Sequence, residues 1–238
     1  MRPLAAQALA ELRMTARRGD SVLLNLAIPL GLLVFFSTVQ VLPVSHPVQF
    51  LTPGVIALAV MSTAMVSTGI ATGFERQYGV LKRLGTTPLG RGRLLAAKVT
   101  AMLAVEVVQV AVLAGAGLAL GWRPGGSEAL GLPAVVLATA AFAGLGLLMA
   151  GSLRAEVTLA AANALYLALL LLGGMVVPLS KFPSGLRDFA RALPAGALSD
   201  ALHGSLTAGA AVPGQAWIVL AAWAAAAPLL AAWTFRWE

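Results

Sequence analysis

The chain contains no cysteine, only two histidines and few charged residues, and each of these shortages excludes a class of function. Without cysteine there are no disulfides, no thiolate nucleophile and no cysteine metal site. The histidines, His46 and His203, have no histidine or cysteine partner, which argues against a metal centre or a Ser-His-Asp triad. We therefore expect a protein that is not an enzyme and that holds no metal.

The signature of a phosphate-binding loop is also missing. A P-loop needs Gly-Lys-Ser/Thr, so that backbone amides and the lysine can hold phosphates. The chain has three lysines, Lys82, Lys98 and Lys181, and they follow leucine, alanine and serine. The chain therefore does not bind ATP in this way.

What the chain has instead is apolar sequence. Hydrophobic residues make up 59% of its 238 residues and charged residues only 11%, whereas average soluble domains carry about 25% charged residues. Six apolar runs are long enough to cross a bilayer as helices, which needs about 20 residues: 22–42, 54–74, 99–120, 131–151, 157–177 and 216–235. The predicted fold is an all-α membrane protein with six transmembrane helices, in a single transmembrane domain covering 1–238.

The net charge of +7 is distributed unevenly between the two faces of this arrangement. The basic residues lie in short segments between apolar runs, which suits membrane lipids better than nucleic acid. Twelve of the sixteen Lys and Arg residues fall on the face that holds the termini and the loop after the second run. The positive-inside rule therefore predicts that both termini are cytoplasmic.

Three segments outside the spans have patterns of their own. Within the N-terminal segment 1–21, residues 3–18 contain leucines at helical spacing beside basic residues, which indicates a helix lying on the cytoplasmic surface; the alternative is a solvated tail. The pattern of residues in the loop 75–93 predicts a short amphipathic helix that ends before Thr87-Pro88. This helix either offers a surface to a partner or only anchors the loop.

The outer loop 178–214 is long enough to contain helices. Ser184 is expected to cap a helix that runs to Leu193 and is stopped by Pro194, and a weaker helix is expected over 198–206. We expect these helices to lie on the surface or to re-enter the bundle in part; the alternative is a lid that only seals the bundle.

Glu106 is the only residue of a charged type (Asp, Glu, Lys or Arg) inside a predicted span. Such a residue is costly in hydrocarbon and often functional, so it either belongs to a substrate pathway or makes a hydrogen bond between helices. Asn25, Asn163 and Tyr166 are weaker candidates, for which helix packing is the simpler role.

Several short motifs follow one another along the segment from Leu51 to Lys98. They are Pro53-Gly54 at the start of the second span, Glu75-Arg76 after it, then the run Gly79 to Leu84, Thr87-Pro88-Leu89, and Lys98 at the start of the third. As a set they closely resemble the type-2 ABC transporter permeases. Gly144-Leu145-Gly146 and the stretch Gly173 to Pro178 extend the resemblance, with Gly173 in place of the usual serine.

This resemblance implies the membrane permease subunit of an ATP-binding-cassette exporter. Such a subunit moves an amphipathic substrate, a drug, an antibiotic or a lipid, out of the cytoplasm or inner leaflet. Two permease chains, identical or different, would work with two ABC ATPase subunits, which bind ATP and Mg, in a bacterial cytoplasmic membrane. Implied residues of the coupling helix that contacts the ATPase are Glu75, Arg76, Tyr78, Gly79, Leu81, Lys82, Arg83 and Leu84.

The resemblance also implies a substrate pathway between the second and fifth helices of the two chains. Candidates for it are Met61, Met65 and Thr68, with Asn163 and Tyr166, to which Glu106 is added because of its depth in the membrane. Ordinary packing is the alternative role for each. A stand-alone carrier or channel and a lipid-acting enzyme are competing functions, but the sparse charge in the spans and the lack of a catalytic cluster argue against them.

Overall fold

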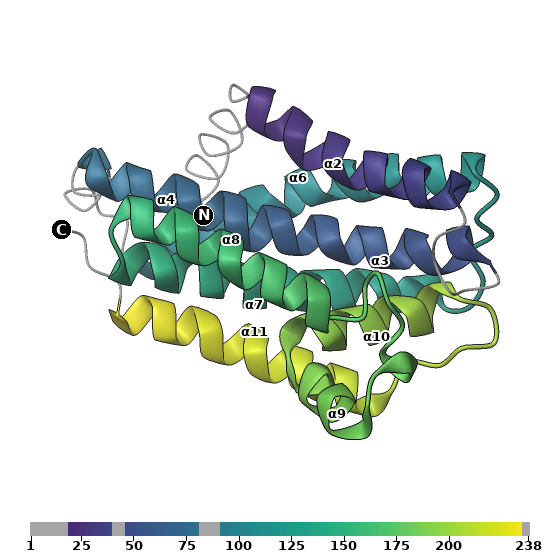
Figure 1. Ribbon diagram of the computed structural model, residues 1–238. Helices are drawn as coiled ribbons and strands as arrows, with labels where there is room; N and C mark the ends of the chain where they lie inside the picture. The colour runs from purple at the N-terminus through teal and green to yellow at the C-terminus, as the bar shows by residue number, and fades with distance from the viewer. Residues whose placement is uncertain (1–18, 40–45, 81–90, 235–238) are drawn as a thin grey trace.

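The computed structural model describes residues 19–39, 46–80 and 91–234, and the regular structure in these ranges is entirely helical (Figure 1). The predicted surface helix over 3–18 and most of the basic loop lie outside the described residues. The elements in chain order are α2 (Gly19–Thr38), α3 (Pro47–Met61), the π-helix η1 (Ser62–Ser67), α4 (Thr68–Gln77), α6 (Arg91–Ala119), α7 (Glu128–Ser152), α8 (Ala155–Leu172), the 3-10 helix η2 (Leu179–Lys181), α9 (Ser184–Ala192), α10 (Pro194–Leu206) and α11 (Gly214–Thr234).

Five helices of the described chain are long and apolar enough to cross a membrane. They are Pro47–Gln77, Ala96–Ala119, Ala129–Ser152, Ala155–Leu172 and Gly214–Thr234. The first predicted span corresponds to α2, of which Asn25–Thr38 forms a shorter apolar helix. The all-α membrane fold predicted from the sequence is confirmed.

Three predicted boundaries are wrong by several residues. The second span begins at Pro47, not at 54, because proline is well placed in a first helical turn and the helix then continues past Pro53. The third helix begins at Arg91, earlier than the predicted 99. The fifth ends at Leu172 rather than 177, because Gly174 takes a φ of +70° that turns the chain out of the helix.

The prediction for the outer loop also needs correction. Ser184 is the first residue of α9 rather than its cap, and no side chain caps that helix. Pro194 does not simply stop a helix, because it begins α10 in the position where proline costs no hydrogen bond. The second outer helix is therefore longer than the predicted 198–206.

Helix α7 is the central element of the bundle and packs against α11, α4, α10 and η1 (Figure 1). Glycines allow these helices to approach closely. A side chain at Gly144 would meet the backbone of Ala227 and Pro228, and one at Gly146 would meet the Met65 carbonyl. Small residues at such contacts are the usual means by which membrane helices gain dispersion energy from close packing.

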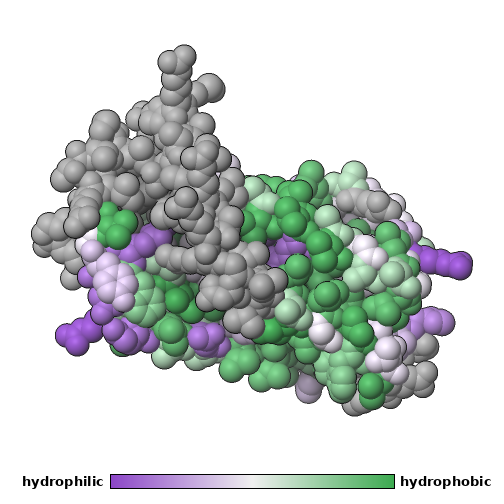
Figure 2. Space-filling view, turned by 90° about the horizontal axis from the view of Figure 1, so that it is seen from above, coloured by the Kyte–Doolittle hydropathy of each residue, from purple (hydrophilic) through white to green (hydrophobic). Residues whose placement is uncertain are grey.

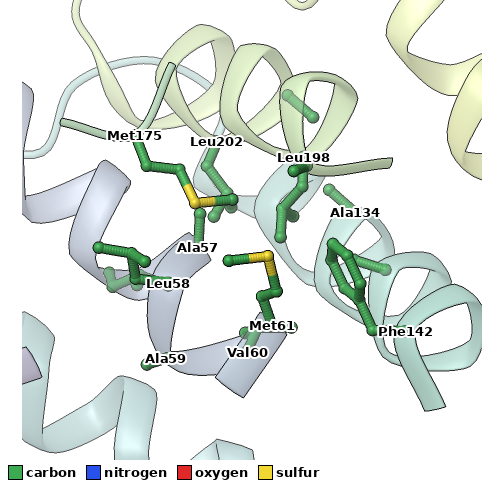
Figure 3. Close-up of a cluster of buried hydrophobic side chains, with 14 of the residues drawn as sticks. Ala57, Leu58, Ala59, Val60, Met61, Ala134, Phe142, Met175, Leu198 and Leu202 are labelled. Atoms are coloured by element: carbon green, nitrogen blue, oxygen red, sulfur yellow. The ribbon is translucent and has the colours of Figure 1, made fainter. Parts of the chain in front are cut away.

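Helix α10 is buried inside the bundle, whereas its neighbour α9 is largely exposed. Leu198 and Leu202 of α10 face Met61 of α3 and Met175, with Phe142 of α7 at the edge of the same cluster (Figure 3). Helix α10 therefore matches the expectation that an outer helix re-enters the bundle in part, rather than lying on its surface.

On the face shown in Figure 2, the coloured surface is mainly hydrophobic along the middle of the molecule, with hydrophilic side chains toward its two ends. Large apolar side chains point outward from several helices, among them Ile28, Val107, Leu171, Ile218 and Trp233. Contiguous exposed apolar surface of this kind is unfavourable in water and suits contact with lipid.

Within the described ranges, basic residues assigned to the two faces by sequence lie at opposite ends of the bundle. At one end Arg76 of α4 bonds to Leu153, next to Arg154, where α7 passes into α8. At the other end the backbone N–H of Arg123 bonds to Gln49 of α3. We call the first the inner end and the second the outer end, following the positive-inside rule.

Candidate coupling site at the inner end of the second span

The second span ends in a tight turn at Tyr78 and Gly79. The backbone N–H of Tyr78 donates to the Phe74 carbonyl at 2.9 Å, and the N–H of Gly79 donates to the Arg76 carbonyl at 3.0 Å. Gly79 has a φ of +70°, a left-handed conformation that glycine adopts without strain. This local chemistry stops α4 and redirects the chain.

One turn before that point, a buried ion pair joins the second span to the third. The Lys98 Nζ of α6 lies 2.7 Å from the Glu75 Oε2 of α4, and both side chains are almost fully removed from solvent. Lysine and glutamate are seldom fully buried unless they are paired, and an oppositely charged partner offsets much of the cost of burying both. The pair therefore ties α4 to α6.

Two further bonds tie the end of α4 to the junction between α7 and α8. The Arg76 Nη2 donates to the Leu153 carbonyl at 2.6 Å, and the Gln77 Nε2 donates to the Glu156 Oε1 at 2.9 Å. The arginine thus satisfies a carbonyl at the C-terminus of α7, where a positive charge is favoured. We call these two bonds, together with the Glu75–Lys98 pair, the inner clamp.

Beyond the clamp, the span ends in an exposed tip. Tyr78 has 72% of its surface exposed and stacks on Phe74 with ring centroids 6.2 Å apart, and Val80 is exposed as well. The tip presents an aromatic and an aliphatic side chain on a turn that is anchored to three other helices. This arrangement fits a protein–protein contact, since exposed aromatic groups are favoured at interfaces.

Comparison with known families identifies the chain. A family model described as ABC-2 type transporter matches residues 6–206. The chain belongs to this family. The resemblance read from the sequence is thereby confirmed, and the protein is a multi-pass membrane component of an ABC transporter. No curated protein matches the chain.

In this ABC-2 transporter chain the predicted coupling residues fall into three groups. The side chains of Glu75 and Arg76 make intramolecular bonds in the inner clamp, whereas Tyr78 and Gly79 form the exposed tip. The other four, Leu81, Lys82, Arg83 and Leu84, lie outside the described residues.

Sequence reasoning missed three members of the clamp: Lys98 as the partner of Glu75, and Gln77 with Glu156. The signal for Lys98 was present, because a lysine that begins a long apolar run needs a counter-ion if it is buried. Nothing in the sequence indicates the contact between Gln77 and Glu156, which are 79 residues apart.

The six predicted pathway residues are distributed over different parts of the bundle. Met61, Met65 and Thr68 are buried in the packed second span, and Glu106 of α6 is bonded to Thr139 of α7.

The two candidates on α8 differ: Tyr166 packs against the apolar core that contains Met61 and Met65, whereas Asn163 does not. The Asn163 side chain is exposed and donates back to the Leu159 carbonyl of its own helix at 2.9 Å. Tyr166 is half-buried in the same helix. The structure therefore does not bring the six together within one chain.

A cleft of about 490 Å³ lies at the outer end and contains none of these six residues. Arg191 and Asp200 form an ion pair at its wall, with the Arg191 Nε 3.2 Å from the Asp200 Oδ2. His203 stacks on Phe50 with ring centroids 4.6 Å apart, and its Nε2 lies 3.0 Å from the Phe50 carbonyl. Burial lowers the pKa of His203 and raises that of Asp200.

Proposed function

We propose that the chain is the permease subunit of an ABC exporter that moves an amphipathic substrate, a drug, an antibiotic or a lipid, out of the cytoplasm or inner leaflet. A separate ABC ATPase that binds ATP and Mg supplies the energy. The observation that carries the proposal is the exposed tip at Tyr78–Gly79, anchored by the clamp to the helices around it. Membership of the ABC-2 type transporter family supports the general part of the proposal, that the chain is a membrane component of an ABC transporter.

The clamp gives a physical route for the motion. Force applied at the tip reaches α6 through the Glu75–Lys98 pair, because an ion pair in a low-dielectric site is strong and short. The same force reaches the α7–α8 junction through the bonds of Arg76 and Gln77. The inner ends of four helices then move together instead of α4 bending alone.

The working unit in this proposal contains two permease chains, identical or different, and two ATPase subunits in a bacterial cytoplasmic membrane with both termini inside. Substrate passes between the second and fifth helices of the two chains. In this arrangement the exposed Asn163 of α8 is the pathway residue that a second chain can reach most directly, while Tyr166 packs against the core and keeps part of its surface free. Efflux and antibiotic resistance are the expected phenotypes for a drug substrate.

The experiment that tests the proposal replaces the tip aromatic. Y78E places a charge where an ATPase surface is expected, and F189A is the matched control because Phe189 is an exposed aromatic at the outer end. With a cognate ABC ATPase in proteoliposomes, we expect Y78E to lose co-purification and ATP-driven transport while F189A keeps both.

Two probes separate the substrate classes. Ethidium reports a cationic drug, and a fluorescent phosphatidylethanolamine reports a lipid. Flux of either probe through the chain without any ATPase supports a stand-alone carrier and contradicts the exporter proposal, as does full transport by Y78E.

A further inference from the structure

The second span is not one uniform α-helix. Between α3 and α4 the residues Ser62–Ser67 form a π-helix, in which hydrogen bonds run from i to i+5. A π-turn contains one residue more than the α-turn it replaces, so it changes the register of everything that follows. Such segments are uncommon, and neighbouring contacts are needed to hold them in place.

A ring of side chains holds this segment from outside. The Asn25 Nδ2 of α2 donates to the Ser67 Oγ at 2.8 Å, and the Thr63 Oγ1 donates to the Gln109 Oε1 of α6 at 2.9 Å. The ring closes where the Gln109 Nε2 donates to the backbone carbonyl of Asn25 at 2.7 Å. We call these four residues the register ring.

The orientation of the Gln109 amide is fixed by its partners. The Asn25 carbonyl can only accept, so it requires the NH₂ group, and the opposite oxygen is left to accept from the Thr63 hydroxyl. Gln109 is almost completely buried, so both of its bonds form away from water. In addition, the Thr68 hydroxyl donates to the Thr63 carbonyl at 3.2 Å, which satisfies a backbone oxygen inside the π-turn.

The two halves of the span are held by different neighbours. The inner half, α4, is fixed by the clamp and by the close contact of Gly69 with Gly146 of α7. The outer half is packed against α10 in the apolar core. The π-segment lies between these two attachments, and the ring grips it at both of its ends, Thr63 and Ser67.

We propose that the register ring locks the second span in its π-helical register, and that opening the ring lets the segment relax to an α-helix and turn α4 against α3. Relaxation moves α4 by one residue, which is about 100° of rotation and about 1.5 Å of translation. Gln109 and Asn25 are then positioning residues for the inner half of the span. The inference rests on these contacts alone and does not depend on the proposed exporter function.

Cysteine cross-linking of the full chain in nanodiscs tests the lock, because the chain has no cysteine of its own. A Cβ at Gly73 lies 3.5 Å from the Ala155 Cα of α8, so the pair G73C/A155C reports the π register. After relaxation the preceding residue occupies that place, so the pair T72C/A155C reports the rotated register. The measured quantity is the ratio of the second cross-linking rate to the first.

We expect Q109L to raise this ratio about eightfold, since it removes two hydrogen bonds of ordinary membrane strength. N25A removes only the bond to Ser67, is milder for folding, and is expected to raise the ratio about threefold. Q49L is the matched control, because Gln49 bonds to the Gly121 carbonyl at the outer end and takes no part in the ring.

Deleting Val66 tests the register itself. The shortened segment can form a plain α-helix with α4 already in its observed place, so Q109L is expected to leave the ratio unchanged in this background. A ratio that does not rise in Q109L or N25A overturns the proposal. So does a rise in Q109L that persists after the deletion, or an equal rise in Q49L, because each would indicate general loosening and not a change of register.

Discussion

The two ends of the bundle are held together by different forces. At the inner end, the second span is tied to its neighbours by the ion pair Glu75–Lys98 and by bonds from Arg76 and Gln77. At the outer end, α10 lies in an apolar cluster, and a nearby open cleft has the ion pair Arg191–Asp200 on its wall.

The difference indicates which end can rearrange. A few directional bonds can break and re-form as discrete units, and each is strong only while its geometry is kept. An interdigitated apolar core resists small displacements, because every shift loses many weak contacts at once. While its bonds hold, the inner end should move as one unit; any exchange of partners is expected there, and the outer core is expected to move as a rigid body.

The largest effect is expected from breaking the ion pair on one side only. K98M leaves the Glu75 carboxylate buried without its partner, which should cost about 3–5 kcal/mol of stability. E75Q/K98M removes both charges and should recover most of that loss. Thermal unfolding of the purified chain in detergent measures both changes.

The matched control for this prediction is K181M, because Lys181 is an exposed lysine at the outer end. It should leave the melting temperature unchanged. A loss in E75Q/K98M as large as in K98M would show that the inner end does not depend on this ion pair.

A cavity in the outer core should have the next largest effect. L198A removes a fully buried side chain between α10 and the second span, and the expected cost is about 3 kcal/mol. L186A, at an exposed leucine of α9, is the control and should cost little. If L198A unfolds no more readily than L186A, α10 is not packed as the structure describes and the contrast between the two ends fails.

The sequence predicted much of this fold because membrane spans have a strong local signal. Long apolar runs defined the helices, and the distribution of arginine and lysine defined the two ends. Helix ends were predicted less well, since Pro47 and Gly174 act through backbone geometry that composition does not reveal. The burial of α10 was left open, because its short, small-residue sequence is compatible with either a surface or an interior position.

The candidate site was predicted as a list of residues but not as an arrangement. Glu75, Arg76 and Gly79 were chosen through a family resemblance, whereas their partners were not. Lys98 is 23 residues from Glu75, and Leu153 is 77 residues from Arg76, so only the packing of helices brings them together. The π-segment was also missed, because its hydrogen bonds have no distinct hydrophobic pattern.

A smaller effect is expected at the turn that ends the second span. G79A puts a Cβ on a residue with a φ of +70°, and the expected cost is about 1–2 kcal/mol. G115A is the control: Gly115 lies within α6 with no atom within 4 Å of an added Cβ, so alanine should stabilise the helix slightly. Opposite shifts in melting temperature confirm the prediction, and a neutral G79A contradicts the requirement for glycine at this turn.

The smallest effect concerns the rim of the outer cleft and depends on pH. Burial lowers the pKa of His203 below its ordinary 6.5, so in acid the unfolded chain binds a proton that the folded chain does not. The stability of the fold should therefore fall as the pH decreases below about 6.5. The raised pKa of Asp200 acts in the opposite sense, and Arg191 and His46 line the same cleft, so a difference between variants is needed to isolate the histidine.

H203Q provides that difference. The melting temperature of H203Q minus that of wild type should increase as the pH is lowered from 8 to 5. The reason is that the variant lacks the histidine that binds a proton in the unfolded wild-type chain. H46Q is the control, since His46 is the only other histidine of the chain and is exposed. If the two variants follow the same curve, the rim of the cleft does not sense pH through His203. The same conclusion would follow if the melting temperatures of wild type and H203Q changed in parallel with pH. The stability of the outer end would then not depend on the protonation of His203, which leaves its apolar packing as the main contrast with the charged inner end.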